Sequence, residues 1–198
     1  MNIRILDESV EIEGYVNAVE RLSKPLHSAL GQFKERIAQG AFGRAIERAS
    51  DVSCLLNHDW NRNLGSIKNG NLELSEDNIG CRVRLTTADP QVREDALNGN
   101  LVGWSFGFSD IDVDVHDENG TTVRDVKDME LYEVSVLNRD TSPAYEGTLV
   151  TVRDDVNVQI EYRQHVGDVD IKKEITPKKA HIDYSAYEQM IKDLKGEK

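Results

Sequence analysis

The stretch LVGWSFGFSDIDVDVHDENGTTVRDVKDMELYEVSVL, residues 101–137, gives the clearest indication of the fold. Residues 101–108 form an apolar run, and residues 111–115 alternate isoleucine or valine with aspartate, the period of a strand with one wet face. Asn119-Gly120 is a tight-turn dipeptide, and residues 129–137 alternate again. The stretch therefore predicts successive strands joined by short turns.

Other segments of the chain, and residues 121–126 within this stretch, have the same character. Alternating or apolar β-branched runs predict further strands at residues 10–19, 52–57, 64–68, 71–75, 81–86, 121–126, 148–152 and 156–162. Asn69-Gly70 lies between two of these runs and predicts a β-hairpin there. Residues 23–31 contain Pro25 and Gly31 and predict a loop.

Two short helices are expected among these strands. Residues 41–48 are rich in helix formers, and residues 90–97 follow Asp89, a good N-cap residue, with Pro90 at the first helical position. Many short strands with few helices indicate a mainly β fold, a closed or partly open β-barrel or a sandwich.

The carboxyl-terminal part of the chain is expected to be an appendage. We expect one folded domain over residues 1–153, and a strand or linker plus a short helix over residues 154–198. Residues 166–177 are polar and unpatterned, whereas residues 184–194 carry an apolar stripe at helical spacing, which predicts an amphipathic helix. Exposed linkers are where proteases cut, so this tail is a plausible cleavage region or docking element.

Composition restricts the possible partners. The chain has 198 residues and a formal net charge of −12, and such a surface repels a phosphate backbone. No apolar run approaches the roughly 20 residues of a membrane span, and the first residues lack a secretory signal. We therefore expect a protein that stays in the cytoplasm and binds neither nucleic acid nor membrane.

The cysteines suggest neither a metal site nor a nucleophile. Cys54 and Cys81 are the two cysteines, and they do not form a CxxC motif. Cys54 lies four residues before His58, but its apolar surroundings favour the role of a small hydrophobic residue. No cofactor or metal is expected.

Three side chains are candidates for hydrolytic chemistry. His58 ends an apolar run and is followed by Asp59, so it could face a cleft or be a surface histidine in a turn. Ser105 lies between two aromatic residues and points away from them on a strand, either toward a base or into a crowded interior. Glu133 shares a strand face with apolar residues, and a buried carboxylate needs a partner such as an imidazole. The alternative for Glu133 is an exposed edge-strand position.

Four ordered sequence blocks resemble the tailed-phage prohead (capsid maturation) serine proteases. The blocks are IEGY at 12–15 with FKERI at 33–37 and GAF at 40–42, LLNHD at 55–59 with LG at 64–65, GWSFGF at 103–108, and YEVSV at 132–136 with PAY at 143–145. The resemblance runs from about residue 12 to residue 145.

The resemblance implies a serine endopeptidase with a fold related to herpesvirus assemblin, a β-barrel flanked by helices. It implies Ser105 as nucleophile, His58 as base, Glu133 as third member where the relative has histidine, and Arg139 near the oxyanion site. The implied substrates are the scaffold, the extension of the major capsid protein, and the protease itself, inside the assembling prohead in the host cytoplasm. Self-association is also possible.

Two other functions remain open from the sequence. The first is a catalytically inactive β-barrel scaffold or assembly module of the capsid. The second is a metal-dependent hydrolase that uses His58 and Asp59, for which the sequence offers no further ligands at workable spacing.

Overall fold

The computed structural model describes residues 1–28, 31–140, 149–153, 158–166 and 168–173. Within these residues the chain is mainly β, as predicted. A five-stranded sheet has the order β13-β1-β2-β8-β7, and its strands are β1 (Asn2–Ile5), β2 (Val10–Ala18), β7 (Leu72–Glu76), β8 (Gly80–Thr87) and β13 (Asp170–Lys173). No helix among these residues is long and apolar enough to cross a membrane.

The second sheet carries the candidate site. It has eight strands: six follow the order β11-β12-β9-β10-β4-β3, while β5 pairs with β10 and β6 pairs with β5. Its strands are β3 (Leu26–Ser28), β4 (Gly31–Ile37), β5 (Ser53–Leu56), β6 (Asp59–Ser66), β9 (Leu101–Glu118), β10 (Thr121–Asn138), β11 (Leu149–Arg153) and β12 (Val158–Val166). No pairing among the described residues closes either sheet into a ring, so the barrel remains a prediction.

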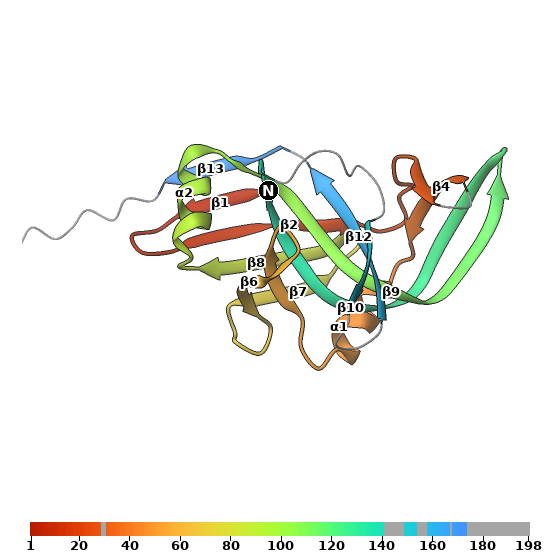
Figure 1. Cartoon of the computed structure of the whole chain (residues 1–198), viewed down its shortest axis with the longest axis horizontal. Helices are drawn as coiled ribbons and strands as arrows, with labels where there is room; N and C mark the ends of the chain where they lie inside the picture. The colour runs from red at the N-terminus through yellow and green to blue at the C-terminus, as the bar shows by residue number, and fades with distance from the viewer. Residues whose placement is uncertain (29–30, 141–148, 154–157, 167, 174–198) are drawn as a thin grey trace, which may run out of the picture.

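The β9–β10 hairpin is the longest feature of the fold. Its two-residue turn is Asn119-Gly120, with φ angles of 56° and 80°, the positive values that a type I′ turn requires. Register shifts interrupt the ladder near Asp128 and Glu133. The shift near Asp128 falls between the two strands that the sequence predicted at residues 121–126 and 129–137, which the structure joins into one. The far end of the hairpin projects from the body of the molecule (Figure 1), and Ile111 and Val115 are exposed on it.

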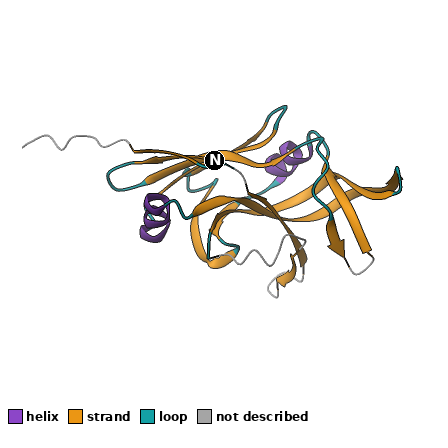
Figure 2. Ribbon diagram, turned by 90° about the horizontal axis from the view of Figure 1, so that it is seen from above, coloured by secondary structure: helices purple, strands orange, loops and turns teal. Residues whose placement is uncertain are grey.

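One hydrophobic core joins the two sheets, and β2 contacts β9 across it. The predicted helices are α1 (Ala41–Arg48) and α2 (Pro90–Asn98), and they lie apart from each other at the outside of the sheets (Figure 2). The Asp89 side chain caps α2 by accepting a hydrogen bond from the Val92 amide, as predicted. Phe42 of α1 packs edge-on against Phe106 of β9, with ring centroids 5.2 Å apart.

Three local predictions were wrong. The turn at Asn69-Gly70 does not join a hairpin, because β6 pairs with β5 while β7 pairs with β8 in the other sheet. The expected loop at residues 23–31 contains β3, which pairs with β4. The segment that lacked a pattern, residues 166–177, contains β13, which pairs in parallel with β1. The helix predicted at residues 184–194 lies outside the described residues.

Candidate active site

His58 lies at the tip of a two-residue hairpin between β5 and β6. Leu56 pairs with Asp59, and Asn57 and His58 have φ angles of 55° and 62°. Asparagine and histidine are among the non-glycine residues that adopt this left-handed conformation most readily. The Asn57 amide donates to the Val136 carbonyl at 3.0 Å, so the hairpin tip is held beside β10.

The imidazole of His58 meets the carboxylate of Glu133 on β10. The His58 Nδ1 to Glu133 Oε1 distance is 2.8 Å, and the Glu133 side chain is fully buried. A carboxylate can only accept, so a neutral imidazole donates from Nδ1 and leaves Nε2 as an acceptor. Nε2 is buried and has no hydrogen-bond partner among the described residues. The pair therefore has the polarity that a general base requires.

Ser135 is a second contact of this pair, and the sequence interpretation gave it no role. Its hydroxyl donates to Glu133 Oε2 at 2.5 Å and accepts from the His58 amide at 3.1 Å. The sequence signal for this contact was the spacing, because Ser135 is two residues from Glu133 and therefore on the same face of the strand. The Ser135 hydroxyl therefore bonds both the Glu133 carboxylate and the main chain of His58.

Ser105 lies on β9 directly across the ladder from Ser135. Paired residues in a sheet point to the same face, so Ser105 shares the face of Ser135 and Glu133, whereas Phe106 points into the core. Ser105 is completely buried, and its Oγ donates to the carbonyl oxygen of Arg163 on β12 at 2.6 Å. No hydrogen bond joins Ser105 to His58 in the described part of the chain.

Gly107 leaves room for the acid and the base. A Cβ atom at this position would lie 2.7 Å from Glu133 Oε1 and 2.7 Å from Tyr162 Cε1. The Tyr162 ring of β12 packs on the His58 ring, with centroids 4.2 Å apart. The glycine spacing in the β9 motif thus allows the close approach of two side chains, and β12 covers the imidazole.

The remaining candidates lie away from this cluster or are chemically unsuited to it. The Arg139 amide donates to the Asn100 carbonyl at 3.0 Å, and Arg139 lines a surface pocket with Leu101, Asp168 and Ile171. Burial, aided by the Glu133 carboxylate, raises the pKa of the Cys54 thiol well above its ordinary value. A protonated thiol is a poor nucleophile. The described residues contain no group of three or more His, Cys, Asp or Glu side chains arranged to hold a metal ion.

The family model described as caudovirus prohead serine protease matches residues 1–161 of the 198. The chain belongs to this family. The match to the prohead serine proteases includes the hairpin of His58 and the strands of Ser105 and Glu133. A search of curated proteins and a search of solved structures returned no match.

Proposed function

We propose that this prohead-family chain is an active serine endopeptidase with Ser105 as nucleophile, His58 as general base and Glu133 as the acid that orients the base. The observation that carries the proposal is the buried His58–Glu133 pair, whose Nε2 atom is an acceptor without a partner among the residues that the structure describes. Membership in a serine protease family supports the reaction class. The position of Ser105, on the strand next to Glu133 and on the same face, supports its role.

In the proposed reaction, His58 Nε2 takes the Ser105 Oγ proton while Oγ attacks the scissile carbonyl carbon. The proton then passes to the leaving amine, and water hydrolyses the acyl-enzyme by the same base. Proton transfer of this kind contributes about 10²–10⁴-fold to the rate. Glu133 fixes the Nδ1–H tautomer and stabilises the imidazolium.

The proposed substrates are the scaffold segment, the amino-terminal extension of the major capsid protein and the chain itself, inside the assembling prohead of the host cell. A barrel fold like that of assemblin and a protease domain ending near residue 153 belong to the same proposal. An oxyanion role for Arg139 remains a separate prediction, because the Arg139 amide already binds Asn100.

Co-expression of the chain with its capsid protein tests the proposal, with the masses of both products as the readout. We expect Ser105→Ala and His58→Ala to leave both chains whole. Ser109→Ala is the matched control, because Ser109 is on the same strand and its hydroxyl bonds the Tyr132 hydroxyl rather than a residue of the candidate site. Processing by Ser105→Ala would refute the serine mechanism. Loss of processing when a chelator is added to the wild type would indicate metal chemistry. Absence of processing by the wild type would favour an inactive capsid module.

A further inference from the structure

The edge of the serine strand is occupied by the chain itself. β12 pairs antiparallel with β9, and Gln164 stands opposite Ser105 while Tyr162 stands opposite Gly107. Ser105 and Glu133 are completely buried under this arrangement, and Tyr162 covers His58. Another polypeptide can reach the nucleophile only after β12 leaves. Residues 162–166 of β12 also lie beyond the part of the chain that the family model matches.

β12 presents one particular peptide bond to the nucleophile. The Ser105 hydroxyl donates to the carbonyl oxygen of Arg163 at 2.6 Å, so the carbon of that carbonyl is also close to Oγ. A hydroxyl that donates to a carbonyl oxygen lies on the oxygen side of the C=O bond, so Ser105 Oγ has to turn toward the carbon before it can attack. The bond that follows this carbonyl is Arg163–Gln164.

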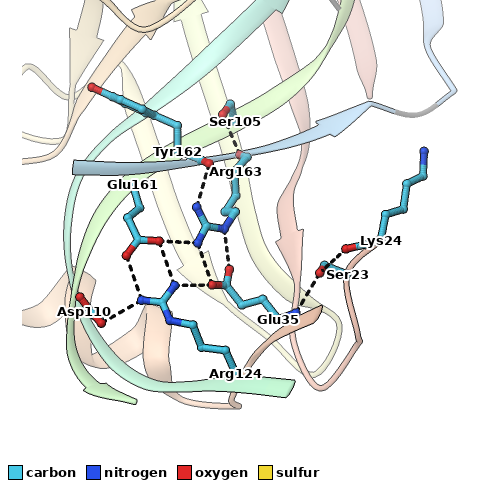
Figure 3. A network of polar contacts seen from close by, with 9 residues as sticks. All are labelled: Ser23, Lys24, Glu35, Ser105, Asp110, Arg124, Glu161, Tyr162 and Arg163. Atoms are coloured by element: carbon cyan, nitrogen blue, oxygen red, sulfur yellow. Dashed lines mark hydrogen bonds and ion pairs between the residues drawn. The ribbon is translucent and has the colours of Figure 1, made fainter. Parts of the chain in front are cut away.

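The side chain of Arg163 enters a buried anionic site on the other face of the sheet. Its Nε and Nη2 atoms donate to the two oxygens of Glu35, at 2.7 and 2.8 Å (Figure 3). Arg163 and Glu35 are 7% and 4% exposed, and the guanidinium lies 5.2 Å from the Phe108 ring centroid. Two parallel hydrogen bonds to one carboxylate, beside an aromatic ring, suit the planar guanidinium group of arginine.

Part of this site lies on strands other than β12. Glu35 also accepts a hydrogen bond from Arg124 of β10 at 2.6 Å, and Arg124 bonds Asp110 of β9 at 2.8 Å (Figure 3). Burial opposes the charge on Arg124, but Glu35 and Glu161 together hold the pKa of Arg124 above its ordinary value. Glu35 therefore retains a cationic partner without Arg163, and it can accept a second one from a substrate.

We propose that β12 is the chain's own substrate segment, that the bond cut there is Arg163–Gln164, and that Glu35 selects a basic residue before the cut. The inference rests on the proposed function of Ser105. For attack, the Ser105 proton turns from the Arg163 carbonyl to His58 Nε2 as Oγ bonds the carbonyl carbon. The bond to the Gln164 nitrogen breaks, and that nitrogen takes the proton. Water then frees the Arg163 carboxylate, and departure of β12 opens the site.

Intact mass and amino-terminal sequencing of the full-length chain over time test the cut. We expect fragments 1–163 and 164–198 from the wild type, and an uncut chain from Ser105→Ala. Arg163→Gln is expected to slow the cut at least ~10-fold, since a charge-assisted pair is lost. Arg84→Gln also removes an arginine–glutamate ion pair, to Glu11 in the other sheet, and is expected to leave the rate unchanged.

A synthetic peptide of residues 158–170 gives a test that does not depend on the folding of a variant. The full-length wild type is expected to cut it after Arg163 at least ~10-fold faster than the same peptide with glutamine there. In a folded Glu35→Gln chain this ratio is expected to fall toward one.

The outcomes separate the two proposals. Ser105-dependent cutting of capsid protein, with no cut after Arg163 in chain or peptide, overturns this inference and leaves the proposed function standing. Unchanged arginine preference in Glu35→Gln overturns the role of Glu35. No Ser105-dependent cutting of any substrate overturns both.

Discussion

Replacement of Glu133 by glutamine removes one charge from the candidate site and changes its shape little. The carboxylate is fully buried, accepts from His58 Nδ1 at 2.8 Å, and also accepts from Ser135. During attack His58 becomes an imidazolium beside this carboxylate. Two unit charges about 4 Å apart attract by about 4 kcal/mol at an effective dielectric constant of about 20. Since 1.36 kcal/mol is tenfold in rate, we expect kcat/KM to fall about 10³-fold.

The assay is cleavage of a peptide substrate by folded Glu133→Gln protein, with thermal unfolding as the check on folding. Glu130→Gln is the matched control, because Glu130 lies on the same strand but is exposed and bonds Tyr132. We expect the control to keep wild-type kcat/KM. If Glu133→Gln stays within tenfold of the wild type, Glu133 does not stabilise the imidazolium and the catalytic assignment of this pair is wrong.

Three further outcomes follow from the structure. Gly107→Ala places a Cβ 2.7 Å from Glu133 Oε1, so it should lower the free energy of unfolding by about 1–3 kcal/mol in urea titrations and reduce cleavage. The control is Gly43→Ala, which should be tolerated because its Cβ would lie 3.4 Å from its nearest neighbour, Glu76 Oε2. Burial raises the pKa of both cysteine thiols, so a disulfide reagent at pH 8 should label the native chain far more slowly than the unfolded chain, and alkylation should not inhibit cleavage. Burial acts to raise the pKa of Glu11, but hydrogen bonds from Arg84 and Arg4 hold that pKa below its ordinary value. A carboxylate whose pKa is lower in the folded than in the unfolded chain stabilises the fold at pH values above the unfolded pKa, and this contribution is lost as the pH falls. Glu11→Gln should therefore lower the free energy of unfolding by about 1–3 kcal/mol at pH 7 and by progressively less below about pH 4, measured by urea unfolding at both pH values.

Local sequence signals predicted the elements that local interactions determine. The α2 helix was predicted from its Asp89 cap and Pro90, and the β9–β10 hairpin from alternation and Asn119-Gly120. The parallel pairing of β1 with β13 was missed, because Asn2 and Asp170 are far apart in sequence and each strand has four residues. Asn69-Gly70 misled because a turn dipeptide does not specify which strands its neighbours pair with.

The candidate site shows the same division. His58, Ser105 and Glu133 came from motifs, and the structure brings His58 Nδ1 within 2.8 Å of Glu133 Oε1. The sequence did not reveal the contact of Ser135 with the Glu133 carboxylate or that of the Arg163 carbonyl with Ser105. Both contacts depend on strand register. Register between distant strands is a property of the folded sheet, and no single short pattern encodes it.

The central position of β10 links activity to the completion of folding. This strand pairs with β5 on one side and with β9 on the other, so the acid, the base hairpin and the serine come together only when both ladders have formed. A slip of one residue would turn the Glu133 side chain to the opposite face. Under the proposed function, a nascent or partly folded copy would therefore lack the assembled triad and could not cleave neighbouring chains until the sheet is complete.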